Sequence, residues 1–181
     1  MSAKIAPFAA LSDIASRSKS FAEGLPAQEE AVELWNGIGF TLGGEHFVAP
    51  MGEVTEILHI PRYTQIPGVK SWMQGLANVR GRLLPIMDLG QFFGLSKTPV
   101  STRERRVLVV EHGEVLSGLI VDSVQGMQYF AVDGFIDTVD NVTRSMAPFI
   151  NGAYMKNDEV WKVFSAFTFT ENPDFLSVSQ W

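Results

Sequence analysis

The sequence of 181 residues contains no cysteine. Disulfides, a thiol nucleophile and cysteine metal sites are therefore excluded within this chain, and the composition suits a reducing compartment. Histidine is also scarce: His46, His59 and His112 are isolated, with no second histidine four residues away. A metal site built from them would need distant side chains to converge. We therefore expect neither a metal ion nor another cofactor.

Long apolar runs are missing as well. No stretch approaches the roughly 20 apolar residues that a membrane-spanning helix needs. The N-terminal MSAKIAPFAALSDIASRSKSF also lacks the unbroken apolar segment of a secretory signal. We expect a cytoplasmic protein that does not insert directly into a membrane.

Positive charge is in deficit, with 14 basic and 20 acidic residues. This balance argues against general nucleic-acid binding, which needs a basic surface. The charges are also unevenly distributed. Residues 62–106 hold eight basic and two acidic residues, whereas residues 107–181 hold three basic and ten acidic ones. Two surfaces of opposite sign suit a protein that meets charged partners on more than one face, although a dipolar surface without a partner has the same pattern.

Motifs that would indicate an enzyme are absent. The glycines of GIGFTLGG do not have the spacing of a dinucleotide-binding loop, and the serines lack a nucleophile elbow. The carboxylates with the best claim to acid–base chemistry have no partnering motif, and such residues more often form turns or salt bridges. They are Glu53, Glu56, Asp88 and Asp122. The sequence therefore predicts a protein without catalytic activity.

Residues 1–35 differ from the rest and form an N-terminal extension. Apolar residues recur there at roughly helical spacing, which predicts a partly helical segment. EGLP at 23–26 is a helix stop signal, and residues 27–35 read either as a short acidic helix or as an extended lead-in. We expect the apolar stripe of this extension to dock weakly, on the protein itself or on a partner.

From residue 36 onward the pattern is one of short strands. GIGFTLGGEHFVAPM and RRVLVVEHGEVLSGLIVDSV predict hairpins that turn at Gly43-Gly44 and at Gly113. RLLPIMDL reads as a strand whose Pro85 indicates an edge or a bulge, and WKVFSAFTF reads as a strand throughout. Five phenylalanines, at positions 92, 93, 164, 167 and 169, are expected in the core, and Trp72 and Trp181 at the surface. The fold class is therefore mainly β, a barrel or a sandwich.

The stretch GLANVRGRLLPIMDL, residues 75–89, contains the most informative turn. Asn78 and Gly81 both tolerate left-handed backbone, so NVRG predicts a tight, rigid turn. Such a turn presents the Arg80 guanidinium at low entropic cost, and Glu56 is the expected carboxylate partner. We expect Arg80 and Arg82, which are separated by one residue, to point to opposite faces, and this weakens a joint anion site.

The segments FTLGGEHFVAPMGEVTEIL, GLANVRGRLLPIMDL, RRVLVVEHGEVLSGLIVDSVQGM and FINGAYMKNDEVWKVFS, taken in order, resemble the CheW family. The likeness runs from Gly37 to Phe169, and its most specific element is the pattern G-x-x-N-[LV]-R-G-x-[IL]-x-P-[IV]-x-D-L. The resemblance implies a CheW-like domain at 36–181. Its fold would be two five-stranded SH3-like β-barrel subdomains with short helices and a shared core.

The resemblance also implies a function. Family members are adaptors without catalysis that hold a histidine kinase and a chemoreceptor together in a signalling array. EGLPAQEEAVELWNGIGF resembles the branch that serves type IV pili and twitching motility. The expected partners are the regulatory domain of a CheA-like or ChpA-like kinase and the cytoplasmic tip of a methyl-accepting, PilJ-like receptor. An adaptor of flagellar chemotaxis is the alternative, and a small β-barrel that binds an anionic ligand is a weaker one.

The family's binding positions map onto eight residues of this chain. Arg80 matches the arginine of the motif, within the turn that Asn78 and Gly81 shape, and Glu56 matches its acidic partner. Val54, Ile57 and Gly75 match positions beside the receptor groove. Gly118 matches a position in the hairpin of the second barrel. These residues are the predicted kinase-binding and receptor-binding surface.

Overall fold

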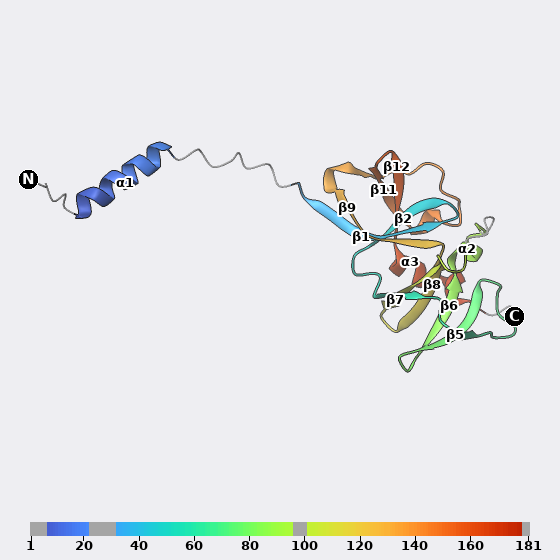
Figure 1. The fold of residues 1–181 in the computed structure, drawn as a ribbon. Helices are drawn as coiled ribbons and strands as arrows, with labels where there is room; N and C mark the ends of the chain where they lie inside the picture. Colours follow the sequence, from blue (N-terminus) through green and yellow to red (C-terminus); the bar gives the residue numbers. More distant parts are fainter. Residues whose placement is uncertain (1–6, 22–31, 96–100, 179–181) are drawn as a thin grey trace, which may run out of the picture. The chain divides into compact units, whose positions relative to one another are not determined.

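The computed structural model describes residues 7–21, 32–95 and 101–178 (Figure 1). The chain divides into two compact units, Met1–Val32 and Glu33–Trp181. In the first unit, helix α1 (Pro7–Phe21) confirms the expected helical segment. The stop signal at 23–26 and most of the expected acidic lead-in fall within 22–31, outside the described residues. Where the description resumes, the chain is extended and enters strand β1 at Leu34.

The second unit is built from two mixed six-stranded sheets, which confirms the mainly β fold class. Barrel A, as we call the first sheet, has the order β10-β11-β12-β2-β1-β9. Its strands are β1 (Leu34–Leu42), β2 (Glu45–Pro50), β9 (Ser123–Ala131), β10 (Phe135–Ile136), β11 (Ile150–Lys156) and β12 (Glu159–Phe164).

Barrel B has the order β3-β7-β8-β6-β5-β4. Its strands are β3 (Glu56–His59), β4 (Tyr63–Thr64), β5 (Met73–Val79), β6 (Arg82–Asp88), β7 (Arg106–His112) and β8 (Val115–Val121). Both sheets curl as SH3-like barrels do (Figure 1). Each has five strands of four or more residues, as expected, and a sixth of only two residues.

Short helices connect or follow the strands. They are α2 (Leu89–Phe92), the 3-10 turns η1 (Val132–Gly134) and η2 (Ala147–Phe149), α3 (Ala166–Thr170) and α4 (Pro173–Leu176). Among the described residues, no helix combines the length and apolar character that crossing a bilayer requires.

Both predicted hairpins are confirmed. β1 and β2 pair around Gly43 and Gly44, whose φ angles of 62° and 86° lie in the left-handed region. Two such residues make the type I′ turn that matches strand twist, and glycine adopts it without strain. β7 and β8 pair across a turn that contains Gly113, which also has a positive φ of 59°.

Of the two alternatives predicted for Pro85, an edge strand or a bulge, the edge strand is wrong. β6 lies inside barrel B, between β8 and β5. The strand tolerates proline because its parallel pairing with β8 covers only Ile86–Asp88. Pro85 precedes this ladder, so its missing N–H interrupts none of those paired positions. On the other side, the pairing with β5 contains a register shift between Met73 and Gly75.

The prediction of one continuous strand in WKVFSAFTF is also wrong. β12 ends at Phe164, and α3 begins directly after Ser165. The Ser165 hydroxyl accepts a hydrogen bond from the Thr168 amide at 3.2 Å, and the Glu53 carboxylate accepts one from the Phe167 amide at 3.1 Å. Two acceptors for the first helical N–H groups stabilise a helix where the apolar alternation alone favoured a strand.

One apolar cluster, which we call the shared core, joins the two barrels and the helices. It contains β1 and β2 residues of barrel A, β5 to β8 residues of barrel B, and side chains from α2, α3 and α4. Phenylalanines dominate it: Phe93 of α2 lies 6.3 Å from Phe164 and 5.7 Å from Phe169, ring centre to ring centre. Smaller clusters fill the interior of barrel B and of barrel A.

The expectation that Trp72 lies at the surface is wrong. Its side chain is buried in the shared core and stacks on Phe175 of α4, with ring centres 6.2 Å apart. Trp181 lies outside the described residues.

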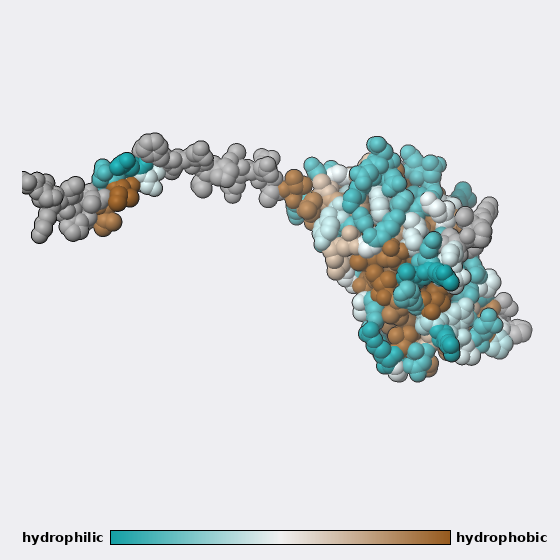
Figure 2. Space-filling view, in the orientation of Figure 1, coloured by the Kyte–Doolittle hydropathy of each residue, from teal (hydrophilic) through white to brown (hydrophobic). Residues whose placement is uncertain are grey.

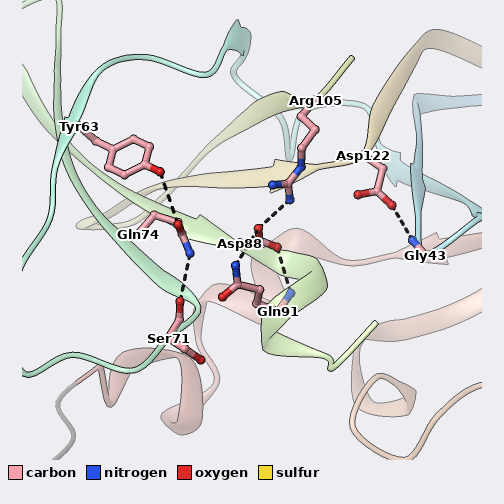
Figure 3. A network of polar contacts seen from close by, with 8 residues as sticks. All are labelled: Gly43, Tyr63, Ser71, Gln74, Asp88, Gln91, Arg105 and Asp122. Atoms are coloured by element: carbon pink, nitrogen blue, oxygen red, sulfur yellow. Dashed lines mark hydrogen bonds and ion pairs between the residues drawn. The ribbon is translucent and has the colours of Figure 1, made fainter. Parts of the chain in front are cut away.

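Asp88 links the end of β6 to helix α2 and to Arg105, the residue before β7 (Figure 3). It is buried at the end of β6, where its carboxylate pairs with Arg105 at 2.6 Å and accepts a hydrogen bond from the Gln91 amide of α2 at 2.9 Å. Asp122 has a comparable role at the crossover between the barrels. Its carboxylate accepts a hydrogen bond from the Gly43 amide at 2.7 Å. Both carboxylates are thus structural, as their lack of a catalytic motif indicated.

Substitution of Asp88 separates its two roles. Asp88→Ala removes the buried ion pair and the cap of α2, and should lower the free energy of unfolding by about 3 kcal/mol. Asp88→Asn keeps a capping oxygen and should be about 1 kcal/mol more stable than the alanine variant. Urea unfolding of both variants measures the difference. Equal stability of the two variants would contradict a capping role.

Candidate functional site

The candidate site begins at the turn between β5 and β6. Arg80 and Gly81 are its two central residues, with φ angles of 53° and 81°. The Asn78 side-chain oxygen accepts a hydrogen bond from the Gly81 amide at 2.9 Å. The tight turn is confirmed, but its left-handed positions are Arg80 and Gly81, and Asn78 supports them from outside. A left-handed arginine costs about 1 kcal/mol relative to glycine.

An ion pair fixes Arg80 in this turn. Its guanidinium donates to the Glu56 carboxylate of β3 at 2.6 Å, which confirms the expected partner. The Arg80 side chain is 76% exposed and that of Glu56 is 29% exposed. The pair connects the β5–β6 turn to β3, the edge strand at the other end of the sheet order. The guanidinium is therefore held in place while most of its surface faces solvent.

A second ion pair lies beside the first. The Arg82 guanidinium donates two hydrogen bonds to the Glu111 carboxylate of β7, at 2.7 and 3.1 Å. This fork-like contact lowers the pKa of Glu111 and raises the pKa of Arg82, chiefly through the hydrogen bonds themselves. Sequence reasoning missed this pair, because Glu111 sits in the hairpin EHGE and belongs to no motif.

Both arginines line one small hollow of about 110 Å³ at the end of barrel B. The prediction that they point to opposite faces is wrong, because residues two positions apart share a face of a strand, and both side chains line this hollow. Each arginine already has a carboxylate partner, so an anionic ligand would have to displace Glu56 or Glu111. Among the described residues, no group of three or more His, Asp and Glu side chains is placed to hold a metal ion.

The other predicted site residues divide into exposed and buried ones. Ile57 is 38% exposed, whereas Val54 is half-buried against the shared core. Gly75 and Gly118 are buried because a side chain has no room there. A Cβ on Gly75 would lie 2.2 Å from the Thr64 carbonyl oxygen, and one on Gly118 would lie 2.8 Å from Val107. These two glycines shape the barrel and offer no contact surface of their own.

An apolar strip adjoins the shared core on the outside, and the sequence analysis selected only one of its four exposed residues, Ile57. Ile38 of the shared core pairs with Met127, and Asn36, two residues earlier, pairs with Tyr129. Since paired residues and alternate residues share a face, Met127 and Tyr129 extend the core face of barrel A. The Met51 amide donates to the Asn36 carbonyl, so Met51 lies across β1 from Tyr129.

Barrel B adds Ile57 to this strip. Ile57 pairs with Leu108, a residue of the shared core. The apolar strip is therefore Met51, Ile57, Met127 and Tyr129, with exposed fractions between 38% and 53%. Figure 2 shows apolar surface across the middle of the second unit, bordered by hydrophilic residues. Successive residues of β3, which point to opposite faces, thus serve two features, with Glu56 on the ion pairs and Ile57 on the strip.

Barrel A has a separate hollow of about 460 Å³. Its rim includes the acidic residues Glu45, Asp140 and Glu159, and its apolar lining includes Ile136, Met155 and Val160. Lys162, nearly buried, pairs with Glu45 at 2.5 Å. No motif in the sequence pointed to this hollow. The second unit therefore carries two distinct surfaces with exposed apolar residues, the apolar strip and this hollow.

Comparison with known proteins gives consistent results. A family model described as the CheW-like domain matches residues 36–171. Protein PilI of Pseudomonas aeruginosa is 54% identical over 173 residues, which cover 96% of each chain. Chemotaxis protein CheW of Helicobacter pylori is 32% identical over 62% of this chain and 67% of its own. The crystal structure of the scaffolding protein TtCheW from Thermoanaerobacter tengcongensis superposes with a TM-score of 0.68 at 24% identity, covering 78% of this chain and 95% of that one.

The left-handed backbone of Arg80 predicts a stability difference between two substitutions. Arg80→Ala and Arg80→Gly both remove the ion pair with Glu56, but only glycine adopts a φ of 53° without strain. The glycine variant should therefore be about 1 kcal/mol more stable than the alanine variant. Urea unfolding compares the two directly, and a less stable glycine variant would show that the turn is not strained at Arg80.

The pair of Arg82 and Glu111 predicts a pH dependence. Because the pKa of Glu111 is lowered from 4.5 in the folded chain, its contribution to stability is present above that pH and is lost as the pH falls through the lower folded value. Denaturant unfolding at about pH 6 and about pH 3 should show the native chain losing its advantage over Glu111→Gln in acid. A constant difference between the two chains would contradict the pairing.

Proposed function

Because the chain belongs to the CheW-like domain family, we propose that it is a non-catalytic adaptor that couples a methyl-accepting chemoreceptor to a histidine kinase. The system we propose is the chemosensory array that controls type IV pili and twitching motility. The observation that carries this proposal is the 54% identity to Protein PilI over 96% of both chains. That match of 173 residues is longer than residues 33–181, so it includes part of the N-terminal extension.

The geometry supports an adaptor because the molecule offers two separate docking surfaces. One combines the apolar strip with the ion-paired Arg80 turn, and the other is the acidic-rimmed hollow of barrel A. A coupling protein needs to hold two partners at once, and exposed apolar patches with polar borders are typical of binding surfaces. Neither surface brings together a nucleophile, a base and an orienting group, the arrangement that catalysis would require.

We assign the receptor to the apolar strip. The cytoplasmic tip of a chemoreceptor is a helical hairpin, and an amphipathic helix binds by laying its apolar face on such a surface. In this assignment Ile57, Glu56 and Arg80 meet the partner, with Asn78 and Gly81 fixing the turn. Val54, Gly75 and Gly118 act from inside by shaping the barrel. The kinase regulatory domain, of the CheA or ChpA kind, binds elsewhere on the protein, which acts in the cytoplasm beside membrane-bound receptors.

An adaptor of flagellar chemotaxis is the second candidate, favoured by the 32% identity to a chemotaxis protein CheW. That match covers 62% of this chain, whereas the PilI match covers nearly all of it. Affinity purification of the tagged chain from its native cells, followed by mass spectrometry, separates the two. A pilus-associated receptor with its kinase supports the proposal, and a flagellar receptor with its kinase supports the alternative.

Replacing Arg80 by alanine tests the docking surface. The variant should fold, because the ion pair is largely exposed and contributes little to stability. Truncating a fixed arginine at an interface typically costs 2 kcal/mol or more, so its affinity for the receptor tip should fall about thirtyfold, whereas its affinity for the kinase domain should not change. Calorimetry with each purified partner measures this loss.

The matched control is Arg144→Ala, at an exposed arginine of the second unit outside both surfaces. It should bind both partners as the native chain does. Unchanged affinity of Arg80→Ala for the receptor tip would show that Arg80 has no docking role.

A further inference from the structure

The methionines of the second unit divide into a buried set and an exposed set. Among the described residues, Met73, Met87 and Met146 are buried, whereas Met51, Met127 and Met155 are 53%, 42% and 55% exposed. Two of these exposed thioethers, those of Met51 and Met127, belong to the apolar strip. The third, Met155, lines the hollow of barrel A. The same residue type therefore occurs at similar exposure inside and outside the strip.

The strip sulfurs are chemically accessible. The Tyr129 hydroxyl donates a hydrogen bond to the Met127 sulfur at 2.8 Å, so a polar group already reaches this sulfur at the surface. Met51 follows β2 in a turn and is more than half exposed. An exposed thioether reacts with a hydroperoxide, and the chain contains no cysteine thiol that would compete for the oxidant.

We propose that Met51 and Met127 form a reversible oxidation site that controls docking on the apolar strip. In the reaction the sulfur attacks one peroxide oxygen as the O–O bond breaks. The sulfur is oxidised by two electrons to the sulfoxide, and the hydroperoxide is reduced to an alcohol, or to water in the case of hydrogen peroxide. A thiol-dependent methionine sulfoxide reductase reverses the change.

The consequence for binding follows from polarity. A thioether is flexible and apolar and adapts to a partner's surface, whereas a sulfoxide is polar and keeps a strong hydrogen-bond acceptor that an apolar partner leaves unsatisfied. Two sulfoxides among the four residues of the strip would oppose burial of Ile57 and Tyr129 beside them. The effect on docking rests on the proposed function, while the selective oxidation of the two side chains does not.

The first experiment treats the full-length purified chain with a limited amount of hydrogen peroxide and follows each methionine by peptide mass spectrometry. Met51, Met127 and Met155 should be oxidised about tenfold faster than the three buried methionines, whose survival also shows that the chain stays folded. Oxidation of Met51 and Met127 at the rate of the buried set would overturn the proposal.

The second experiment measures binding of the cytoplasmic receptor tip before and after oxidation. Affinity should fall about tenfold and return after treatment with the reductase. The affinity of the double variant Met51→Leu with Met127→Leu, which conserves apolar volume, should be the same before and after peroxide, because leucine has no sulfur to oxidise. Met155→Leu should lose affinity on oxidation as the native chain does, which controls for oxidation outside the strip.

The outcomes distinguish this proposal from the proposed function. If the reduced chain binds the receptor and the oxidised chain binds it equally well, the control by oxidation is wrong and the adaptor function stands. If the reduced chain fails to bind the receptor, the assignment of the receptor to the strip is wrong, and the docking consequence falls with it.

Discussion

The shared core is the constraint on which the rest of the structure depends. Neither sheet buries both of its faces alone, since the outer faces of β1 and of β7 are as apolar as the barrel interiors. Packing those faces on each other, with α2 and α3 between them, removes this surface from water. The crossover at Asp122 and the cap from Glu53 to α3 then fix the arrangement through hydrogen bonds that bridge distant segments. The strands extend beyond the area in which the two faces are in contact. The apolar residues that remain exposed there form the apolar strip.

The ion pairs at the end of barrel B have a different physical character. They are exposed, so their contribution to stability is small. Their effect is geometric: two carboxylates from β3 and β7 hold two guanidinium groups of the β5–β6 hairpin in one orientation. Asp88 shows the opposite case, an ion pair that is buried and strongly coupled to folding. The chain thus uses buried charge to build its frame and exposed charge to present a surface.

Much of the fold could be predicted from the sequence, for reasons that are local. The pair Gly43-Gly44 permits a type I′ turn, and two β-branched runs flank Gly113, so both hairpins follow from short-range rules. The contact of Arg80 with Glu56 spans 24 residues and was accessible only through the arginine motif and its family partner. The edge-strand prediction for Pro85 and the prediction of one continuous strand in WKVFSAFTF were wrong, because both features depend on tertiary partners. For Pro85 this is the point where β8 begins to pair, and for β12 it is the acceptor that Glu53 brings to α3.

The site itself was predictable only in part, because strand alternation does not reveal what a face will meet. Met127 and Tyr129 share a face by the period of two, but whether that face lies in the shared core or beyond its end depends on the register with β1. Likewise Glu111 of β7 meets Arg82 of β6 across β8, a contact between strands that are not neighbours in the sheet. β3 shows how tightly these requirements are combined. In this strand of four residues, the successive side chains of Glu56 and Ile57 point to opposite faces, the first to the charged turn and the second to the apolar strip. A register slip by one residue would therefore exchange the two surfaces.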